Sequence, residues 1–356
     1  MNKLDRVLLL SVVAILAIGL VVLYSASKEY GRQNIILRQI FWVFFGTVLM
    51  LAATRVDYRR FASISYLLYG VNILLLVLVL FFGKAAGGSH RWLSFGAFNV
   101  QPSELAKITL VLALSAYMSR RKADVTKISF SLIALLIALP AFALILIEPD
   151  LGTALLLLPI TAMMLFVAGA RIKHLIGLTF LGISSLPIFW HFLKDYQKQR
   201  IFVFVNPNTD PLGSGYTVIQ SKIAVGSGGL FGKGWLGGTQ NQLNFLPERH
   251  TDFIFSVVGE EWGFLGALIL LLFYALIIYR GIKIIETNSD TYGKFIAAGF
   301  VSLFFFQLVI NIGMTIGFLP VVGLTLPLIS YGGSSLAAML VCIGLLLNVG
   351  MRRTLF

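Results

Sequence analysis

Charged residues and cysteine are scarce in this chain of 356 residues. Only 12% of its residues are charged, against about 25% in a typical soluble domain. The single cysteine, Cys342, excludes an internal disulfide, and the four histidines show no metal-ligand spacing, so we expect no tight zinc site. The composition is 58% hydrophobic with a mean hydropathy of +0.89. This is typical of an integral membrane protein.

Acidic residues are also few, because 15 Asp and Glu stand against 28 Lys and Arg, a formal net charge of +13. The basic residues are spread between apolar segments and form no basic domain. Membrane topology and anionic lipid both favour this distribution. We therefore expect the membrane, and no nucleic acid, as the partner of these charges.

Apolar runs of about 20 residues, the length that crosses a bilayer, recur along the sequence. They predict an all-α polytopic protein with about ten transmembrane helices in a single integral membrane domain over residues 1–356. The first run exceeds the usual core of a signal peptide, so we interpret it as a retained helix. The predicted spans lie near residues 7–26, 36–54, 64–82, 104–118, 128–147, 151–169, 173–192, 253–279, 294–318 and 330–350.

The Lys and Arg residues of the short loops indicate the orientation. With the amino terminus inside, most of them fall on the cytoplasmic side, as the positive-inside rule requires. Both termini are then cytoplasmic, and the long loop over residues 193–252, between the seventh and eighth helices, is extracytoplasmic. The outer loops hold the polar clusters that contain Gly and Pro. We therefore expect any site to face outward, away from cytosolic nucleotides.

Residues 244–264 hold a dense group of ionisable side chains beside a long apolar run. A charge at the edge of a membrane is costly and therefore suggests a functional site. The competing interpretation is the interfacial end of a helix. The group consists of Glu248, Arg249, His250, Asp252, Glu260 and Glu261.

The Gly-rich run over residues 226–238 does not fit a phosphate-binding loop, because Lys233 is followed by Gly234 rather than by Ser or Thr. We expect instead a flexible loop whose backbone lies close to the membrane or to a ligand. Ser334 and Ser335 have no base beside them in sequence, which argues against serine hydrolysis. We expect no tightly bound cofactor, although a divalent cation held by one or two carboxylates and a substrate phosphate is compatible with the sequence.

Several basic residues and few carboxylates at one membrane face suit a lipid-linked phosphate or diphosphate. Glu104 and Lys107 are three residues apart and share one face of a helix, although a surface ion pair has the same spacing. Sugar transfer from a diphosphate needs one base and positive charge near the leaving group, whereas a glycosidase typically needs two carboxylates. These residues indicate an outer-face site for an anionic, lipid-linked ligand. They do not distinguish moving that ligand from reacting it.

Several motifs occur together in one order. They are HRWLSFGAFNVQPSELAK, EPDLGT, YQKQR, DPLGSGYTVIQSKIAVGSGGLFGKG, LPERHTDFIFSVVGEEWG, NIGM and LPLISYGGSS. On these motifs, essentially the whole chain resembles the SEDS family (shape, elongation, division, sporulation). The resemblance implies the ten-helix SEDS fold and an inverting peptidoglycan glycosyltransferase that polymerises lipid II. The segment GTQNQLNFLPERHTDF resembles elongation-type members more than division-type members.

The resemblance also implies roles for single residues. Asp252 falls on the family's essential aspartate, the proposed general base. Asn99 is a departure, because some elongation-type members have a basic residue there. Substrate binding or shaping of the central cavity is implied for Arg38, Arg91, Glu104, Lys107, Asp150 and Arg200, to which we add Lys222 at the outer face and His250 and Thr251 beside Asp252.

The implied setting is the bacterial cytoplasmic membrane, with lipid II as the substrate. Nothing in the chain resembles a transpeptidase, so a class B penicillin-binding protein is implied as the crosslinking partner, together with further proteins of the elongation complex. A lipid II flippase is the rival prediction, and the sparse ionisable groups within the spans count against it. A division-type polymerase and a noncatalytic scaffold for wall synthesis are two further hypotheses that the sequence leaves open.

Overall fold

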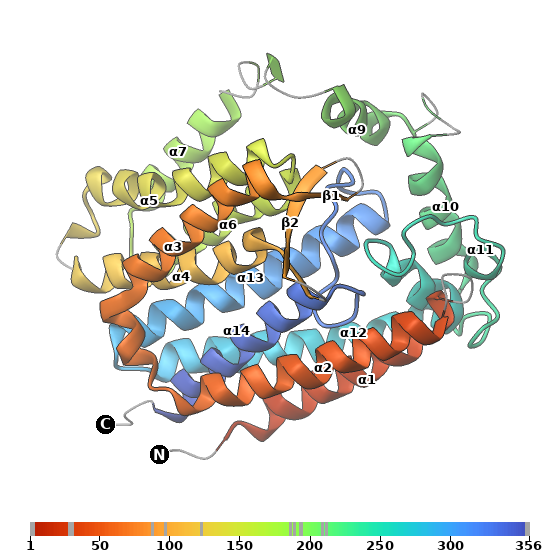
Figure 1. The fold of residues 1–356 in the computed structure, drawn as a ribbon, viewed down its shortest axis with the longest axis horizontal. Coiled ribbons are helices and arrows are strands. Elements are labelled where there is room, and N and C mark those ends of the chain that lie inside the picture. The colour runs from red at the N-terminus through yellow and green to blue at the C-terminus, as the bar shows by residue number, and fades with distance from the viewer. Residues whose placement is uncertain are drawn as a thin grey trace.

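The computed structural model describes residues 4–27, 32–86, 89–95, 98–121, 124–184, 187, 190–191, 195–207, 210 and 213–352. Long helices packed side by side form most of the molecule, and shorter helices lie to one side of this bundle (Figure 1). The bundle comprises α1 (Arg6–Ala26), α2 (Arg32–Arg55), α3 (Phe61–Phe82), α4 (Pro102–Arg120), α5 (Ile128–Ile147), α6 (Leu151–Ala168), α7 (Ile172–Ser184), α12 (Ile254–Thr287), α13 (Thr291–Thr315) and α14 (Gly333–Met351). The shorter helices are α9 (Asp195–Val205), α10 (Ser214–Ser227) and α11 (Thr239–Gln242), and a 3-10 turn, η1 (Tyr58–Arg60), precedes α3.

Eight helices in the described part of the chain are long and apolar enough to cross a membrane. They correspond to eight of the predicted spans. The helix at the fourth predicted span, α4, has 19 residues and carries Glu104 and Lys107. The seventh predicted span is represented by α7, with 13 residues, and part of the range 185–194 lies outside the described residues. The helical, multi-pass membrane architecture is therefore confirmed.

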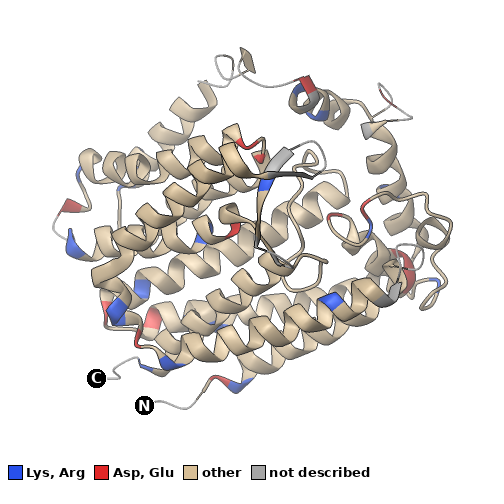
Figure 2. Ribbon diagram, in the orientation of Figure 1, with Lys and Arg blue, Asp and Glu red and all other residues tan. Residues whose placement is uncertain are grey.

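Helices α13 and α14 form the centre of the bundle. Helix α13 packs against α4, α6 and α12, and α14 packs along α2. Large apolar side chains are exposed on outer helices, for example Phe44 on α2, Leu67 on α3 and Leu136 on α5. Such a surface is unfavourable in water and suits lipid. Most charged residues lie at helix ends or in connecting segments (Figure 2).

The connection between α3 and α4 forms a small antiparallel sheet, which the all-α prediction did not include. Strand β2 (Ser89–Phe95) pairs with β1 (Lys84–Ala86) and with β3 (Phe98–Val100). Strand β2 also contacts α3 and α4. The sheet brings Arg91 to the connection between α5 and α6, where its Nε donates to Glu148 O at 3.2 Å.

The Gly-rich run, predicted as a flexible loop, is instead held tightly on the first half of α12. The Lys233 amide donates to Glu260 O at 3.0 Å, and Lys233 Nζ forms an ion pair with Glu260 Oε1 at 2.9 Å. A Cβ added at Gly232 would lie 2.2 Å from Glu261 O, and Gly232 has a φ of +81°. Glycine is needed at this position because two backbones meet there and the residue is left-handed.

Candidate active site

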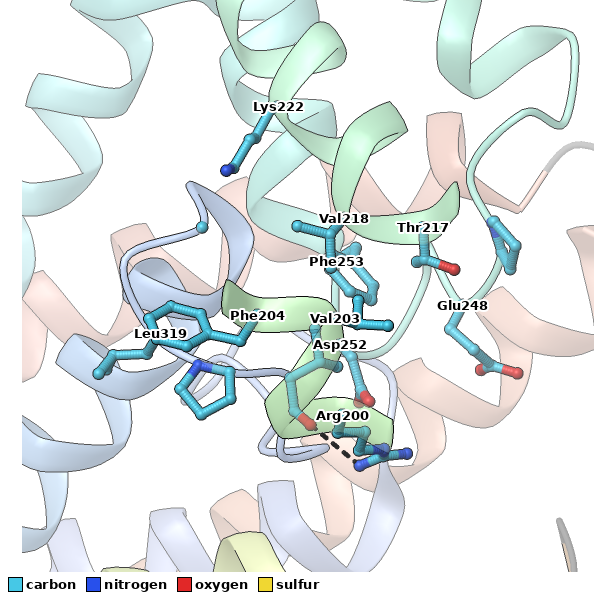
Figure 3. A pocket seen from close by; sticks show the side chains of 14 residues that line it. Arg200, Val203, Phe204, Thr217, Val218, Lys222, Glu248, Asp252, Phe253 and Leu319 are labelled. Carbon is cyan, nitrogen blue, oxygen red and sulfur yellow. Dashed lines mark hydrogen bonds between the residues drawn. The ribbon is translucent and has the colours of Figure 1, made fainter. Parts of the chain in front are cut away.

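A cavity of about 170 Å³ lies between α9, α10, the segment before α12 and the segment after α13 (Figure 3). Asp252 and Glu248 line it from the segment before α12, Arg200 from α9 and Lys222 from α10. Figure 3 shows the Asp252 carboxyl beside the Arg200 side chain, with Lys222 at the other side of the cavity. The apolar part of the wall includes Val203, Phe204, Phe253, Leu319 and Pro320.

The backbone at Asp252 is fixed by three hydrogen bonds from the carboxy-terminal part of the chain. The carbonyl oxygens of residues 250, 251 and 252 each accept one of them. The donors, in the same order, are Tyr331 N at 2.9 Å, Ser330 Oγ at 2.6 Å and Asn311 Nδ2 at 2.9 Å. The position of Asp252 is therefore determined by α13 and by the segment before α14, and not by its own loop alone.

The electrostatic surroundings of Asp252 favour its neutral form. Burial is the largest cause that raises the pKa of Asp252, to about 6. The carboxylate of Glu248 adds to this rise, and Arg200 opposes it. Burial and a like charge both disfavour ionisation. A carboxyl with this pKa is mostly ionised at pH 7 and still accepts a proton more readily than an ordinary aspartate, as a general base must.

Two basic side chains bring positive charge to the cavity. Arg200 Nη1 donates to Val321 O at 3.1 Å, which ties α9 to the segment after α13. The Lys222 side chain makes no hydrogen bond or ion pair with another described residue, and it lies over Gly317, where an added Cβ would come 2.5 Å from its Nζ. This ammonium group is therefore available to an anionic ligand.

Glu104 and Lys107 lie inside the bundle, and they do not line this cavity. Lys107 Nζ is 2.7 Å from Glu104 Oε2 and donates to Gln307 Oε1 at 3.2 Å. The Lys107 side chain is 0% exposed and the Glu104 side chain is 7% exposed, so this is no surface ion pair. Gln307 donates in turn to Thr325 O at 3.0 Å, which connects the pair to the segment before α14.

Arg91 and Asp150 also lie outside the lining of the cavity, but they act on Asp252 through their charges. Asp150 raises the pKa of Asp252 and Arg91 lowers it, both less than Glu248 and Arg200 do. The Asp150 carboxylate caps α6 at Thr153 N, at 3.2 Å, and accepts from Ser103 Oγ at 3.3 Å. In this structure both residues hold the connection between α5 and α6 in place.

The remaining predicted residues are Thr251, His250 and Arg38. Thr251 Oγ1 donates to Glu248 Oε2 at 3.0 Å. The His250 ring lies 5.9 Å from that of Tyr331, between centroids. Arg38 is exposed on α2. The cavity brings together Asp252, Arg200 and Lys222 of the predicted set.

Glu248 is a cavity residue that we did not assign to the site from the sequence. It belongs to the ionisable group before α12, four residues ahead of Asp252, and that proximity was its only sequence signal. In the part of the chain that the structure describes, no three His, Cys, Asp or Glu side chains are grouped to hold a metal ion. A divalent cation at this site stays a prediction.

A family model described as "Cell cycle protein", which joins FtsW, RodA and SpoVE, matches residues 6–355. The chain belongs to this family. The match covers every membrane-spanning helix described above and all residues that line the cavity. The motifs that suggested the SEDS family therefore identified it correctly.

Relatives of known structure or name resemble the chain over its whole length. Peptidoglycan glycosyltransferase MrdB of Escherichia coli (strain K12) is 41% identical over 353 residues, which cover 98% of this chain and 94% of the relative. A chain from the structure titled "Structural coordination of polymerization and crosslinking by a peptidoglycan synthase complex" superposes with a TM-score of 0.85, at 38% identity and 98% coverage of both chains. The crystal structure of RodA from Thermus thermophilus gives a TM-score of 0.75, at 33% identity and 99% coverage of both. The predicted fold class is thereby confirmed.

Proposed function

We propose that the cavity around Asp252 is the active site at which this chain polymerises lipid II. The chain is a peptidoglycan glycosyltransferase, as are its relatives MrdB of Escherichia coli, at 41% identity, and RodA of Treponema pallidum (strain Nichols), at 34% identity. One observation carries the site assignment. A partly buried carboxyl with a pKa raised to about 6 lines the same cavity as two basic side chains.

In this proposal Asp252 removes the proton from the acceptor sugar's hydroxyl while that oxygen attacks the anomeric carbon of the lipid-linked donor. The bond from that carbon to the diphosphate breaks, and the lipid diphosphate leaves with the electron pair. Arg200 and Lys222 stabilise the negative charge that develops on the leaving group. One direct displacement turns an α-linked donor into a β-linked product, and Asp252 then releases its proton to water.

The cavity is proposed to face the extracytoplasmic side of the bacterial cytoplasmic membrane, with both chain termini in the cytoplasm. The bias of Lys and Arg in the short loops supports this orientation. The start of α1 and the end of α14 line one common cavity, which includes Arg6 and Gly350. Those helix ends therefore share one side of the bundle, as the orientation requires.

A class B penicillin-binding protein is the proposed partner, within the elongation machinery. One support is the likeness to a chain from a solved peptidoglycan synthase complex that coordinates polymerization and crosslinking. The family model joins FtsW with RodA, so the elongation assignment depends on the segment over residues 238–253 and not on the family match. Copurification of this chain with an elongation-type or a division-type transpeptidase would separate the two.

Glycan synthesis from purified lipid II tests the proposal. Removal of a general base typically costs about 10²–10⁴-fold in rate, so Asp252→Asn should lose that much polymer synthesis. Asp57→Asn is the matched control, because Asp57 caps η1 and its Oδ1 accepts from Arg59 N at 3.0 Å, away from the cavity. Wild-type polymerisation by Asp252→Asn would reject the assignment.

Two further measurements address the rival function and the metal ion. Translocation of lipid II across vesicles without polymer formation would favour a flippase. Chelation followed by addition of Mg²⁺ or Mn²⁺ tests the divalent cation, which carboxylates and a substrate phosphate would hold together.

A further inference from the structure

One buried amide side chain joins two segments that meet at Asp252. One is the segment before α12, which carries Asp252, and the other is the segment after α13, which carries Leu324. Asn311 lies on α13 and is 0% exposed. Its Nδ2 donates to Asp252 O at 2.9 Å and to Leu324 O at 2.6 Å. Both hydrogens of one NH₂ group are thus used, one on each segment.

The segment after α13 comes close to the Asp252 carboxyl at Gly323. Gly323, which precedes Leu324, has a φ of +78°, and a Cβ added to it would lie 3.6 Å from Asp252 Oδ2. The backbone at Gly323 therefore lies next to the space that the carboxyl occupies. The two Asn311 hydrogen bonds determine the distance between the backbone of Leu324 and the backbone of Asp252.

We propose that Asn311 is a positioning residue for the reaction, which holds Asp252 at a fixed distance from the backbone of Gly323 and Leu324 and so places the carboxyl in the cavity. Asn311 is not part of the cavity lining, so it acts through Asp252 and does not touch the substrate. The inference rests on the proposed role of Asp252 as the general base.

The expected kinetic signature follows from this geometry. A displacement of about 1 Å in a reacting group can cost about 10²-fold in rate. Substrate binding by Arg200 and Lys222 does not involve Asn311. Loss of the amide should therefore lower kcat and leave KM nearly unchanged.

The chain offers a matched control in Asn348 on α14. It is also 0% exposed, and its Nδ2 also donates to two backbone carbonyls, those of Ala53 at 2.6 Å and of Val56. It lies about 22 Å along α14 from the start of that helix, at the rise of about 1.5 Å per residue. Removal of the Asn348 amide breaks two similar buried hydrogen bonds, at the end of α14 that is remote from Asp252.

The experiment compares Asn311→Ala with Asn348→Ala, in polymerisation from lipid II and in thermal unfolding of the full chain in detergent. We expect both variants to lose similar thermal stability. We expect kcat to fall at least about 10-fold in Asn311→Ala only, with KM within about twofold of the wild type. Equal kcat in the two variants, or a higher KM with unchanged kcat in Asn311→Ala, would overturn the inference.

An isosteric pair guards against misfolding of the alanine variants. Asn311→Asp retains the shape of the side chain, but a carboxyl cannot donate two hydrogen bonds in either protonation state. It should therefore lose kcat as Asn311→Ala does, whereas Asn348→Asp should not. Asp252→Asn, measured beside them, separates the two proposals. If Asp252→Asn is fully active the general base is wrong, and if it is inactive while the Asn311 and Asn348 variants match, only the positioning role fails.

Discussion

At the scale of single residues, Asp252 is a costly group to keep. Its pKa is raised from the ordinary aspartate value of 3.8 to about 6, first by burial and then by Glu248. A difference of about two pKa units corresponds to no more than about 3 kcal/mol, less the solvent screening of a partly exposed group. The ionised carboxylate therefore destabilises the fold at neutral pH, as active-site groups commonly do.

Asp252→Asn should consequently unfold at a higher temperature than the wild type at pH 7.5. The sign follows from linkage, because a carboxyl with a raised folded pKa loses its stability contribution as pH rises through about 6. The advantage of the variant should shrink at pH 5, where the wild-type carboxyl is protonated. Melting curves in detergent at both pH values measure this, and a lower melting temperature of the variant at pH 7.5 would contradict it.

Glu148 is a second buried carboxyl, outside the cavity. It is 1% exposed, and neither carboxyl oxygen has a hydrogen-bond partner in the described structure. Burial, with Asp150, raises the pKa of Glu148 to about 8. We expect Glu148→Gln to be more stable than the wild type at pH 7. As pH rises from about 4.5 to about 8, the wild type should lose stability that the variant retains, because the unfolded carboxyl is then ionised while the folded one stays protonated. Parallel pH dependence of the two melting temperatures would disprove this.

The candidate site could be predicted from the sequence only in part. Asp252, Arg200 and Lys222 were predicted, and they line one cavity. Arg91 and Glu104 are buried or bound in other positions. Residue type and position in the chain do not determine whether a charge ends in a cavity or in a buried ion pair, since that depends on which helices pack together.

At the scale of elements, close backbone contact holds the Gly-rich run against α12. Gly232→Ala combines a left-handed φ of +81° with a Cβ 2.2 Å from Glu261 O. The left-handed conformation alone costs about 1–2 kcal/mol for a residue with a side chain, and the collision adds to it. We therefore expect a destabilisation above about 2 kcal/mol, measured by thermal unfolding.

Gly226→Ala is the control for that prediction. Gly226 lies within α10, and an added Cβ there meets no atom within 4 Å. Alanine is favoured over glycine inside a helix by about 0.5–1 kcal/mol. Gly226→Ala should be neutral or stabilising, and equal losses in the two variants would contradict the role of close backbone approach.

Elements that a local sequence pattern marks, such as a continuous apolar run, were predicted well. The spans with continuous apolar runs match helices of the structure. The small sheet from β1 to β3 and the helices α9 and α10 were missed, because they depend on contacts with distant elements. The Gly-rich run shows the same limit, since its glycines reflect close packing on α12 and not flexibility.

At the scale of the whole molecule, the central expectation is the orientation in the membrane. Cys342, the only cysteine, is buried, so single introduced cysteines can report on topology. Leu243 is 61% exposed in the segment between α10 and α12, which also carries the cavity residue Glu248, and Arg171 is exposed between α6 and α7. An impermeant thiol reagent added to intact cells should label Leu243→Cys and not Arg171→Cys. The reverse pattern would place the cavity in the cytoplasm and exclude polymerisation at the outer face.

The pH dependence of polymerisation tests the account most directly. Because Asp252 must be ionised to accept a proton, kcat/KM for lipid II should rise with pH and reach half its maximum near the Asp252 pKa of about 6. The small residual activity of Asp252→Asn should lack this rise. A wild-type profile that is flat between pH 5 and pH 8, or an unchanged rise in Asp252→Asn, would contradict the assignment of Asp252 as the general base.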